Sequence, residues 1–452
     1  MSDQNALTAA EKREKLKAIL RQTGVGQTGM GQAAAVQATP TKDQDIPAAF
    51  YDFDQDPALI GLEMQHQALR DRNLKNPYFM LNDGIARGTT HIDGKEYINF
   101  ANYNYLGLSG EQRVSDAAIN AVQTYGTSVS ASRVASGERP VQRDLEAALA
   151  RAYDVEDSVV MVSGHATNVT VIGHLFGPKD LILHDELAHN SAIQGALLSG
   201  ARRIPFAHND TNALERLLTQ HRGGAERVLI FVEGVYSMDG DLADLPRLVA
   251  LKKRFKAYLM VDEAHSFGVL GKTGLGLREH FGIAGTDVDL WMGTLSKTLA
   301  SCGGYIAGGA SLVRYLRYSA PGFLFSVGIT PPNAAASVAA LEMMQELPER
   351  VADLRARADQ FRDLARAAGL DIGLSEVSAV VPIVLGDSML AIALSNRLFA
   401  RGINVQPVLY PAVEETAARL RFFITSAHSA AQISETVTAI ADALRQLKDH
   451  PE

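Results

Sequence analysis

The sequence has very little cysteine, no excess of basic charge and no long apolar run. Its single cysteine, Cys302, excludes an internal disulfide and fits a reducing compartment. The 43 Lys and Arg residues are outnumbered by 51 Asp and Glu residues, and the net charge of −8 argues against nucleic acid as the main partner. No apolar run approaches membrane-spanning length, and the N-terminus lacks the apolar core of a signal peptide. We therefore expect a cytoplasmic protein that binds neither nucleic acid nor a membrane.

The composition that remains is that of a soluble globular protein, with 46% hydrophobic and 21% charged residues. A chain of 452 residues is too long for one ordinary core, so we expect two lobes and a tail. Residues 1–45 are predicted to form a short amphipathic helix and a flexible linker, because Leu16, Ile19 and Leu20 are spaced along one helix face and a Gly- and Gln-rich stretch follows. This leader is either a tail without a role or a docking helix. The further boundaries are an N-terminal segment over 46–105, a large domain over 106–340 and a small domain over 341–452.

From Asp157 onward, short apolar runs alternate with helical segments. The runs "SVVMVSG", "DLILHD", "RVLIFVEG", "AYLMVDEAH", "DLWMGTLSK" and "GGYIAGG" are apolar enough to be covered on both faces, which is typical of a mostly parallel sheet in an α/β domain. After Leu341 the pattern favours a smaller α+β lobe. Three runs lead into Glu233, Asp262 and Lys297, and ligands bind at the carboxyl ends of such strands, so these residues are predicted to converge.

Lys297 is surrounded by small and hydroxyl residues in "GTLSKTLASCGGYIAG", directly after an apolar strand, which is unusual for a solubilising surface lysine. A positioned, partly desolvated lysine at a strand end can form a Schiff base with the aldehyde of pyridoxal phosphate. That cofactor needs a carboxylate against its pyridine nitrogen, and Asp262 is the candidate. A flat partner for the ring is available in His189. Ser237 and His265 are candidates for the donors to its 3′-oxygen.

The phosphate of such a cofactor needs backbone N–H groups at a helix N-terminus, and "VSGHATN" offers them at a strand-to-helix junction. Each feature alone has an ordinary explanation as a surface lysine, a helix-capping aspartate or a structural histidine. Their order and placement together favour a cofactor site. The predicted cofactor-binding set is Ser163, Gly164, His165, His189, Ser237, Asp262, His265, Thr294, Ser296 and Lys297.

Longer motifs carry a resemblance to a known family. "EGVYSMDGDLADL", "MVDEAHSFGVLGKTGLG" and "GTLSKTLASCGGY", preceded by "NYNYLGLS" and followed by "LRFFITSAH", resemble the α-oxoamine synthases. The resemblance extends from about Asn99 to His428. It implies the fold-type-I fold of pyridoxal-phosphate transferases, similar to aspartate aminotransferase, with a mostly parallel large domain and a smaller α+β C-terminal domain.

The resemblance also implies residue roles. Lys297, His189, Asp262 and His265 match the catalytic positions. Asn104 and Arg421 match the pair that holds the amino-acid carboxylate, and a guanidinium on a half-buried strand suits bidentate binding of a carboxylate. Ser132 and Arg133 lie at positions associated with substrate binding. Metal is not expected, because the spacing of the histidines does not match a ligand set.

The implied reaction condenses a small α-amino acid with an acyl thioester and releases CO₂ and the free thiol, leaving an α-amino ketone. Lys297 would remove the Cα proton of the amino acid. Glycine, alanine and serine stay open as the amino acid, and coenzyme A or an acyl carrier protein as the acyl carrier. A homodimer is implied by the resemblance alone.

The chain departs from the family pattern at several positions. Ser130 and Ala131 replace glycines, and Gln142 replaces a histidine. His165 stands where an aromatic residue is usual. Val327 and Gly328 replace hydroxyl residues that contact the neighbouring subunit's phosphate in relatives, which puts that contact in doubt. The stretch "GERP" is closer to members associated with polyketide assembly.

Three alternatives compete with this interpretation. An aminotransferase or a decarboxylase would use the same cofactor set, although the flanking motifs favour the synthase. A catalytically silent partner subunit is disfavoured by the presence of Lys297, Asp262 and His265. A P-loop nucleotide site is suggested by "GKTG" at Gly271, but Ser266 occupies the position of its first glycine and excludes it.

Overall fold

We describe residues 46–449 of a computed structural model of the chain, which divides into one unit ending at Ala68 and another starting at Leu69. The predicted leader helix and linker lie outside the described residues. The described part of the first unit begins with two short helical turns and enters a longer helix. These elements are η1 (Ala48–Phe50), η2 (Phe53–Gln55) and α2 (Pro57–Asp71), the last of which continues past the boundary between the units.

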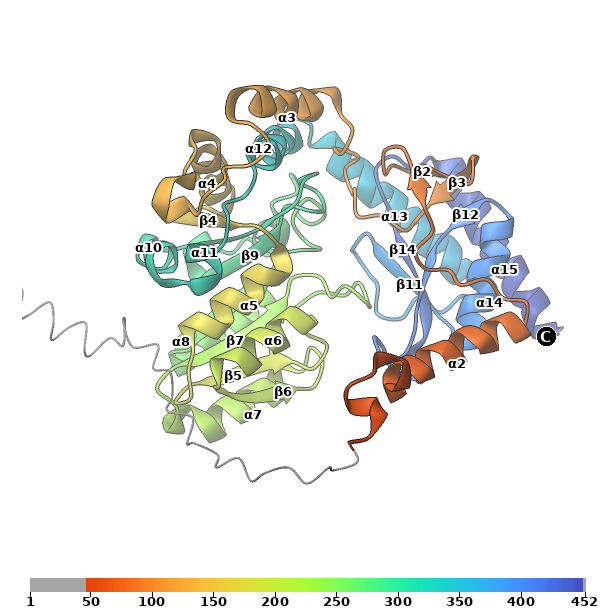
Figure 1. Cartoon of the computed structure of the whole chain (residues 1–452), viewed down its shortest axis with the longest axis horizontal. Helices are drawn as coiled ribbons and strands as arrows, with labels where there is room; N and C mark the ends of the chain where they lie inside the picture. The colour runs from red at the N-terminus through yellow and green to blue at the C-terminus, as the bar shows by residue number, and fades with distance from the viewer. Residues whose placement is uncertain (1–45, 450–452) are drawn as a thin grey trace, which may run out of the picture. The chain divides into compact units, whose positions relative to one another are not determined.

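The second unit is built on a seven-stranded sheet with the order β4-β10-β9-β8-β7-β5-β6 (Figure 1). Its strands are β4 (Asp157–Met161), β5 (Leu181–Asp185), β6 (Arg202–Phe206), β7 (Val228–Glu233), β8 (Tyr258–Asp262), β9 (Leu290–Thr294) and β10 (Gly304–Gly308). The adjacent strands β9, β8, β7, β5 and β6 pair in parallel, and β10 runs antiparallel to its neighbours β4 and β9. The prediction of a mostly parallel central sheet is confirmed. Only β6 was not predicted, because this edge strand begins with two exposed arginines.

Residues that alternate along the central strands pack into two separate cores, one on each face of the sheet. Leu229 and Phe231 face the side covered by α5 (Gly164–Leu175), α6 (Asn190–Ser199), α10 (Ala310–Ser319) and α11 (Pro321–Leu324). Val228 and Ile230 face the side covered by α4 (Pro140–Tyr153), α7 (Thr211–His221), α8 (Leu245–Phe255), α9 (Gly276–Phe281) and α12 (Pro331–Glu346). Burial on both faces explains why these strands are continuous apolar runs.

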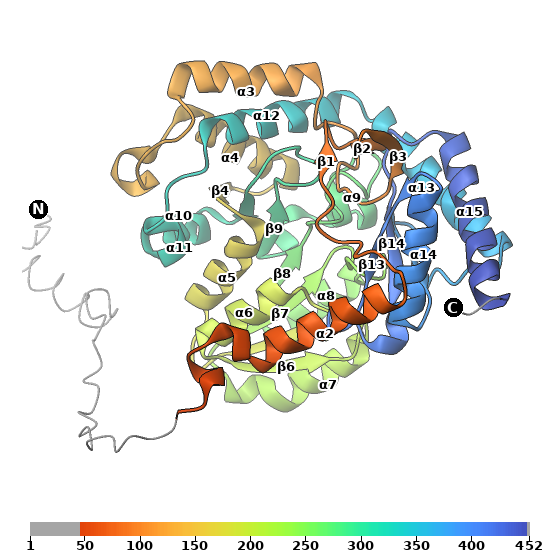
Figure 2. The same cartoon turned by 45° about the vertical axis from the view of Figure 1, so that its right-hand side comes forward.

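Helix α3 (Gln112–Tyr125) packs along α12, as both views show (Figure 1, Figure 2). The connections between these layers contain three short helical turns. They are η3 (Arg133–Gly137), η4 (Arg222–Gly224) and η5 (Gly285–Asp287).

The C-terminal lobe combines a three-stranded antiparallel sheet with helices. The sheet has the order β11-β14-β13, with β11 (Val380–Val384), β13 (Gln406–Val408) and β14 (Arg419–Phe423). Its helical elements are α13 (Glu349–Ala367), α14 (Ser388–Ala400), α15 (Ala430–Asp449) and the short η6 (Glu415–Ala417). This lobe is the smaller α+β domain that the sequence predicts.

Part of the N-terminal segment belongs to the same lobe. The strands β1 (Asn82–Asp83), β2 (Thr89–Ile92) and β3 (Lys95–Asn99) form a second sheet with β12 (Ile403–Asn404). Strand β12 pairs in parallel with β3, so residues more than 300 positions apart share one sheet (Figure 1). Among the helices of residues 46–449, none is long and apolar enough to cross a membrane.

A buried ion network joins η3, α4, β4 and α10. The Arg133 and Glu146 side chains are each 2% exposed, and Arg133 Nη1 lies 2.5 Å from Glu146 Oε1. Arg317 Nη2 lies 2.8 Å from Glu146 Oε2, and its Nη1 lies 2.9 Å from Asp157 Oδ2. Each buried charge therefore has a partner, as burial of a charge requires.

Replacing Arg133 by methionine removes one cation and leaves the buried Glu146 carboxylate with the more exposed partners Arg317 and Arg143. We expect the free energy of unfolding to fall by about 3 kcal/mol, the lower end for breaking a buried pair. Urea denaturation followed by circular dichroism measures this change. The matched control is Arg143→Met, because the half-exposed Arg143 side chain pairs with Glu138 and Glu146, the two carboxylates that also pair with Arg133. We expect this variant to lose under about 1 kcal/mol of unfolding free energy. Equal losses in the two variants would contradict a stabilising role for Arg133.

Candidate active site

The polar residues at the ends of neighbouring central strands converge, as the sequence predicts. Glu233 ends β7 and Asp262 ends β8, and the two residues are register partners in the parallel pair. Lys297 follows the adjacent strand β9, and its charge acts on both Glu233 and His189. The carboxyl edge of the sheet thus gathers two buried carboxyl groups and one amine.

Burial is the main cause that lowers the pKa of Lys297, while Asp262 and Glu233 oppose the shift and the charge of Arg421 adds to it; together these effects bring the pKa to about 8. The amine lies 5.4 Å from the ring centroid of Tyr103. A lysine with this pKa has a sizeable neutral fraction near neutral pH, and the neutral amine is the form that attacks an aldehyde.

Asp262 is a buried carboxylate held by two hydrogen bonds. The backbone N–H of Ala264 donates to its Oδ1 at 3.0 Å, and Asn168 Nδ2 donates to its Oδ2 at 2.8 Å. Within residues 46–449, no lysine, arginine or histidine forms an ion pair with this carboxylate. A buried anion without a cationic partner fits the protonated pyridine nitrogen of pyridoxal phosphate.

Glu233 accepts hydrogen bonds from the backbone of two predicted cofactor-binding residues. The N–H of His189 donates to Glu233 Oε1 at 2.7 Å, and the N–H of Ser237 donates to Oε2 at 3.3 Å. Burial, helped by the neighbouring Asp262, raises the pKa of Glu233 to about 8 although its two hydrogen bonds and Lys297 oppose the shift. Glu233 therefore fixes His189 and Ser237 relative to one another.

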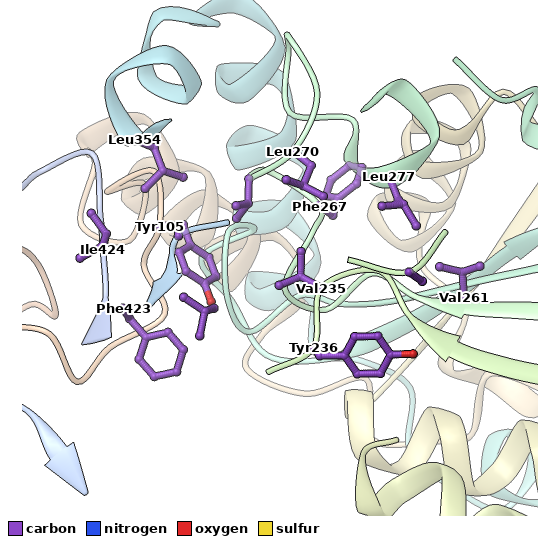
Figure 3. Packing of buried hydrophobic residues seen from close by; sticks show 14 of the residues in the cluster. Tyr105, Val235, Tyr236, Val261, Phe267, Leu270, Leu277, Leu354, Phe423 and Ile424 are labelled. Carbon is purple, nitrogen blue, oxygen red and sulfur yellow. The ribbon is translucent and has the colours of Figure 1, made fainter. Parts of the chain in front are cut away.

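His265 is buried at the same edge of the sheet. The Tyr105 hydroxyl lies 2.7 Å from its Nδ1, and its ring stacks on Phe423 at 6.0 Å. Burial lowers the pKa of His265 well below its usual value, and Lys297 adds to this effect. Figure 3 shows Tyr105 and Phe423 side by side, with a ring separation of 6.2 Å.

The predicted phosphate cradle forms where β4 leads into α5. Ser163 caps the helix, and Gly164 and His165 follow it as the first helical residues, with their N–H groups available to an anion. A Cβ on Gly164 would lie 3.0 Å from Thr294 Oγ1, so glycine allows this close approach. Thr294 Oγ1 lies 2.7 Å from Ser296 Oγ, which brings the two predicted hydroxyls together.

Arg421 on β14 reaches the same region from the small lobe. Its Nη1 donates to the carbonyl of Ser237 at 3.0 Å, and its guanidinium lies 4.7 Å from the ring centroid of Phe423. Its Nε is buried without a hydrogen-bond partner, and burial lowers the pKa of Arg421. No carboxylate of the described chain pairs with it, which leaves a partly buried cation suited to the carboxylate of a ligand.

The loop between Ser237 and Asp241 is held from both lobes. His208 lies 2.9 Å from Asp185 and 2.8 Å from Asp241, and these carboxylates raise its pKa to about 10 although burial opposes the charge. From the small lobe, Arg419 Nη1 donates to Asp239 Oδ1 at 2.6 Å. A protonated His208 thus anchors the loop to the large domain.

The structure does not bring every predicted residue into this cluster. The Asn104 amide donates to the carbonyls of Ala86 and Ser109 and accepts from the N–H of Ser109, so its hydrogen bonds shape a local turn. Tyr103, one position earlier, contacts Lys297 instead. Arg133 belongs to the buried ion network and Ser132 precedes it at the start of η3, and neither contacts Lys297, Asp262 or Arg421 among the described contacts.

Other residues at the site were not predicted from the sequence. Tyr103 and Tyr105 stand in the "NYNYLGL" motif, and Asn168 is a polar residue on the buried face of α5. Glu233 was noted at a strand end but was not assigned to the site. The sequence marks such residues only as polar residues within apolar segments. That pattern does not show which side chains they contact in the fold.

Comparison with known proteins identifies the family. The model of the family "Aminotransferase class I and II" matches residues 95–440. The 8-amino-7-oxononanoate synthase of Geobacter sulfurreducens is 43% identical over 353 residues, which is 77% of this chain and 89% of that protein. The corresponding synthase of Fervidobacterium nodosum is 40% identical over 341 residues, covering 75% and 86%. The chain is an α-oxoamine synthase of the class I and II aminotransferase family.

Solved structures agree with this family. Serine palmitoyltransferase of Sphingomonas wittichii superposes with a TM-score of 0.83 at 28% identity, covering 87% of this chain and 99% of that one. An 8-amino-7-oxononanoate synthase of Francisella tularensis gives a TM-score of 0.68 at 26% identity, covering 78% and 99%. This α-oxoamine synthase therefore has the fold-type-I fold and is a pyridoxal-phosphate-dependent acyltransferase.

The lowered pKa of Lys297 predicts how the cofactor-free synthase captures pyridoxal phosphate. Only the neutral amine attacks the aldehyde, so the capture rate should rise about tenfold per pH unit below pH 8 and level off above it. Stopped-flow absorbance after mixing with the cofactor measures this rate. In Asp262→Asn the plateau should begin at a lower pH, because Asp262 raises the pKa of Lys297. A rate that continues to rise through pH 10 would contradict a desolvated amine.

Proposed function

We propose that the synthase condenses a small α-amino acid with an acyl thioester, releasing CO₂ and the free thiol and forming an α-amino ketone. The observation that carries this proposal is the partly buried guanidinium of Arg421, whose buried Nε has no hydrogen-bond partner and whose charge acts on Lys297. An amino-acid carboxylate bound there would hold its Cα near the lysine amine. Bound pyridoxal phosphate supplies the electron sink that acidifies the Cα hydrogen.

The side chains of this chain support the proton transfers. With its pKa near 8, Lys297 can accept the Cα proton near neutral pH and return it later. The charge of Asp262 favours the protonated amine, whereas Arg421 favours the neutral one. The anionic carboxylate of a substrate on Arg421 would offset that second effect and raise the basicity of the lysine.

The names of the relatives favour alanine as the amino acid. In 8-amino-7-oxononanoate the amino group is on the eighth of nine carbons, so the last two carbons correspond to Cα and Cβ of alanine after loss of its carboxylate. The first seven carbons then correspond to a dicarboxylic acyl group. We propose alanine as the first amino acid to test, with serine and glycine beside it.

The acyl carrier is either coenzyme A or an acyl carrier protein. The basic, amphipathic leader predicted at residues 7–22 would suit an acidic carrier protein, and this favours the carrier protein slightly. We also expect a homodimer, which light scattering coupled to size-exclusion chromatography tests directly.

The reaction is tested by supplying the holoenzyme with alanine, serine or glycine together with acyl chains on coenzyme A or on a carrier protein. We expect thiol release and CO₂ release in equal amounts, and a product mass equal to the two substrates less CO₂ and the thiol. Transfer of the amino group without thiol release would instead identify an aminotransferase. Release of CO₂ without thiol release would identify a decarboxylase.

Replacing Lys297 by alanine should abolish both the visible absorbance of the lysine-bound cofactor and turnover, because its amine forms the bond to the cofactor and carries the proton. Absorbance spectra and the thiol-release assay measure the two effects. Lys272→Ala is the matched control, since this exposed lysine lies outside the site. Normal turnover in the Lys297 variant would refute the assignment.

Deleting residues 1–45 tests the leader. If it docks a carrier protein, the KM for the carrier-bound acyl chain should rise about tenfold or more while the KM for the coenzyme A thioester stays unchanged. Thiol-release kinetics with each donor measure this difference. Unchanged kinetics with the carrier-bound substrate would remove the docking hypothesis.

A further inference from the structure

A buried polar chain connects two predicted cofactor-binding residues, Asp262 and His189. Asn168 on α5 is 1% exposed, and Ser191 on α6 is fully buried. Asn168 Nδ2 lies 2.8 Å from Asp262 Oδ2 and 2.9 Å from Ser191 Oγ. Ser191 Oγ in turn lies 2.7 Å from His189 Nδ1. The chain therefore runs from Asp262 through Asn168 and Ser191 to His189.

The chemistry of the groups fixes the direction of each hydrogen bond. An ionised Asp262 only accepts, so the Asn168 atom that faces it must be the nitrogen. The same NH₂ group carries a second hydrogen, which it donates to Ser191 Oγ. The Asn168 Oδ1 atom is buried and has no hydrogen-bond partner. An amide flipped by 180° would place its oxygen against the carboxylate, so this orientation is the favourable one.

The Ser191 hydroxyl accepts from Asn168 and so has its own hydrogen to donate. His189 Nδ1 is the acceptor within reach, and the backbone N–H of Ser191 also points to Nδ1 at 3.3 Å. Two donors converge on Nδ1, which therefore carries no proton. Partial burial lowers the pKa of His189, with Asp262 opposing and Lys297 adding to that shift, which favours the neutral ring. The single proton of a neutral His189 then sits on Nε2.

We propose that Asn168 and Ser191 are positioning residues that join Asp262 to His189 and hold the proton of His189 on Nε2. This inference rests on the proposed function, because a proton held on Nε2 leaves His189 able to donate from that atom to a substrate oxygen. The Asn168 amide also orients the Asp262 carboxylate. Two predicted cofactor-binding residues are thereby linked through residues outside the predicted cofactor-binding set.

The direct test is the tautomer of His189 in the full-length holoenzyme. In protein with ¹⁵N-labelled histidine, a protonated nitrogen and a bare nitrogen have clearly different chemical shifts, and the signal lost in His189→Gln assigns the ring. We expect the Nε2–H tautomer in the unaltered chain. In Ser191→Ala the hydroxyl donor is lost and only the backbone N–H at 3.3 Å still points to Nδ1, so a measurable share of the rings should carry the proton on Nδ1.

The second test is cofactor affinity, which does not depend on turnover. Ser191→Ala removes the link while leaving the Asn168–Asp262 bond, and we expect a several-fold rise in the Kd for pyridoxal phosphate. Asn168→Asp replaces a donor to a charged group by a second carboxyl, and we expect a rise of about tenfold or more. Ser199→Ala is the matched control, since this buried serine lies on the same helix α6 and donates to Ala196 within it.

The outcomes separate this inference from the proposed function. The Nδ1–H tautomer in the unaltered chain, or an unchanged tautomer population in Ser191→Ala, would overturn the inference even if the condensation proceeds. A Kd for Ser191→Ala equal to that of Ser199→Ala would do the same if Asn168→Asp fails to fold. Absence of thiol release in the unaltered chain, with the expected tautomers present, would refute the function and leave the hydrogen-bond chain intact.

Discussion

The site depends on one amine being removed from water beside two carboxyl groups. Lys297 is held at the edge of the central sheet near Asp262 and Glu233, which end neighbouring strands, and burial outweighs both carboxyl groups in setting its pKa. If burial were weaker, the amine would stay protonated and unreactive. If the carboxyl groups were absent, it would lose its proton too readily to return it. The parallel strands supply this balance because their carboxyl ends lie at one edge.

The departures from the family pattern are connected to one another in the structure. Gln142, which replaces a histidine, donates from Nε2 to the carbonyl of Ile329 and accepts the N–H of Arg139. A Cβ on Gly328 would lie 2.7 Å from Arg133 Cγ and 3.0 Å from Gln142 Nε2. The glycine therefore accommodates the glutamine and the buried arginine, which is a structural reason for the missing hydroxyl at this position.

Much of the fold and the central part of the site were predictable, because strands buried on both faces are continuous apolar runs and their ends carry the chemistry. Lys297 and Asp262 were predicted in this way, and His189 was predicted as the flat partner that the cofactor ring would need. Asn104 and Tyr103 show the limit, since both stand in one motif and only the turn made by Ala86 and Ser109 decides which side chain faces the lysine. Asn168 shows it again, because its partners come from other segments of the chain.

The contact of Arg421 with the carbonyl of Ser237 has a consequence for exchanging parts between relatives. The side chain of Ser237 belongs to the large domain's cofactor site, while its backbone is the support for an arginine of the small lobe. The loop is fastened further by Ser378, whose Oγ donates to the carbonyl of Gly240 at 2.7 Å. A chimera that takes the C-terminal lobe from a relative would therefore also have to take residues 236–241 from it. This loop belongs in sequence to the large domain, but its backbone makes hydrogen bonds to the C-terminal lobe.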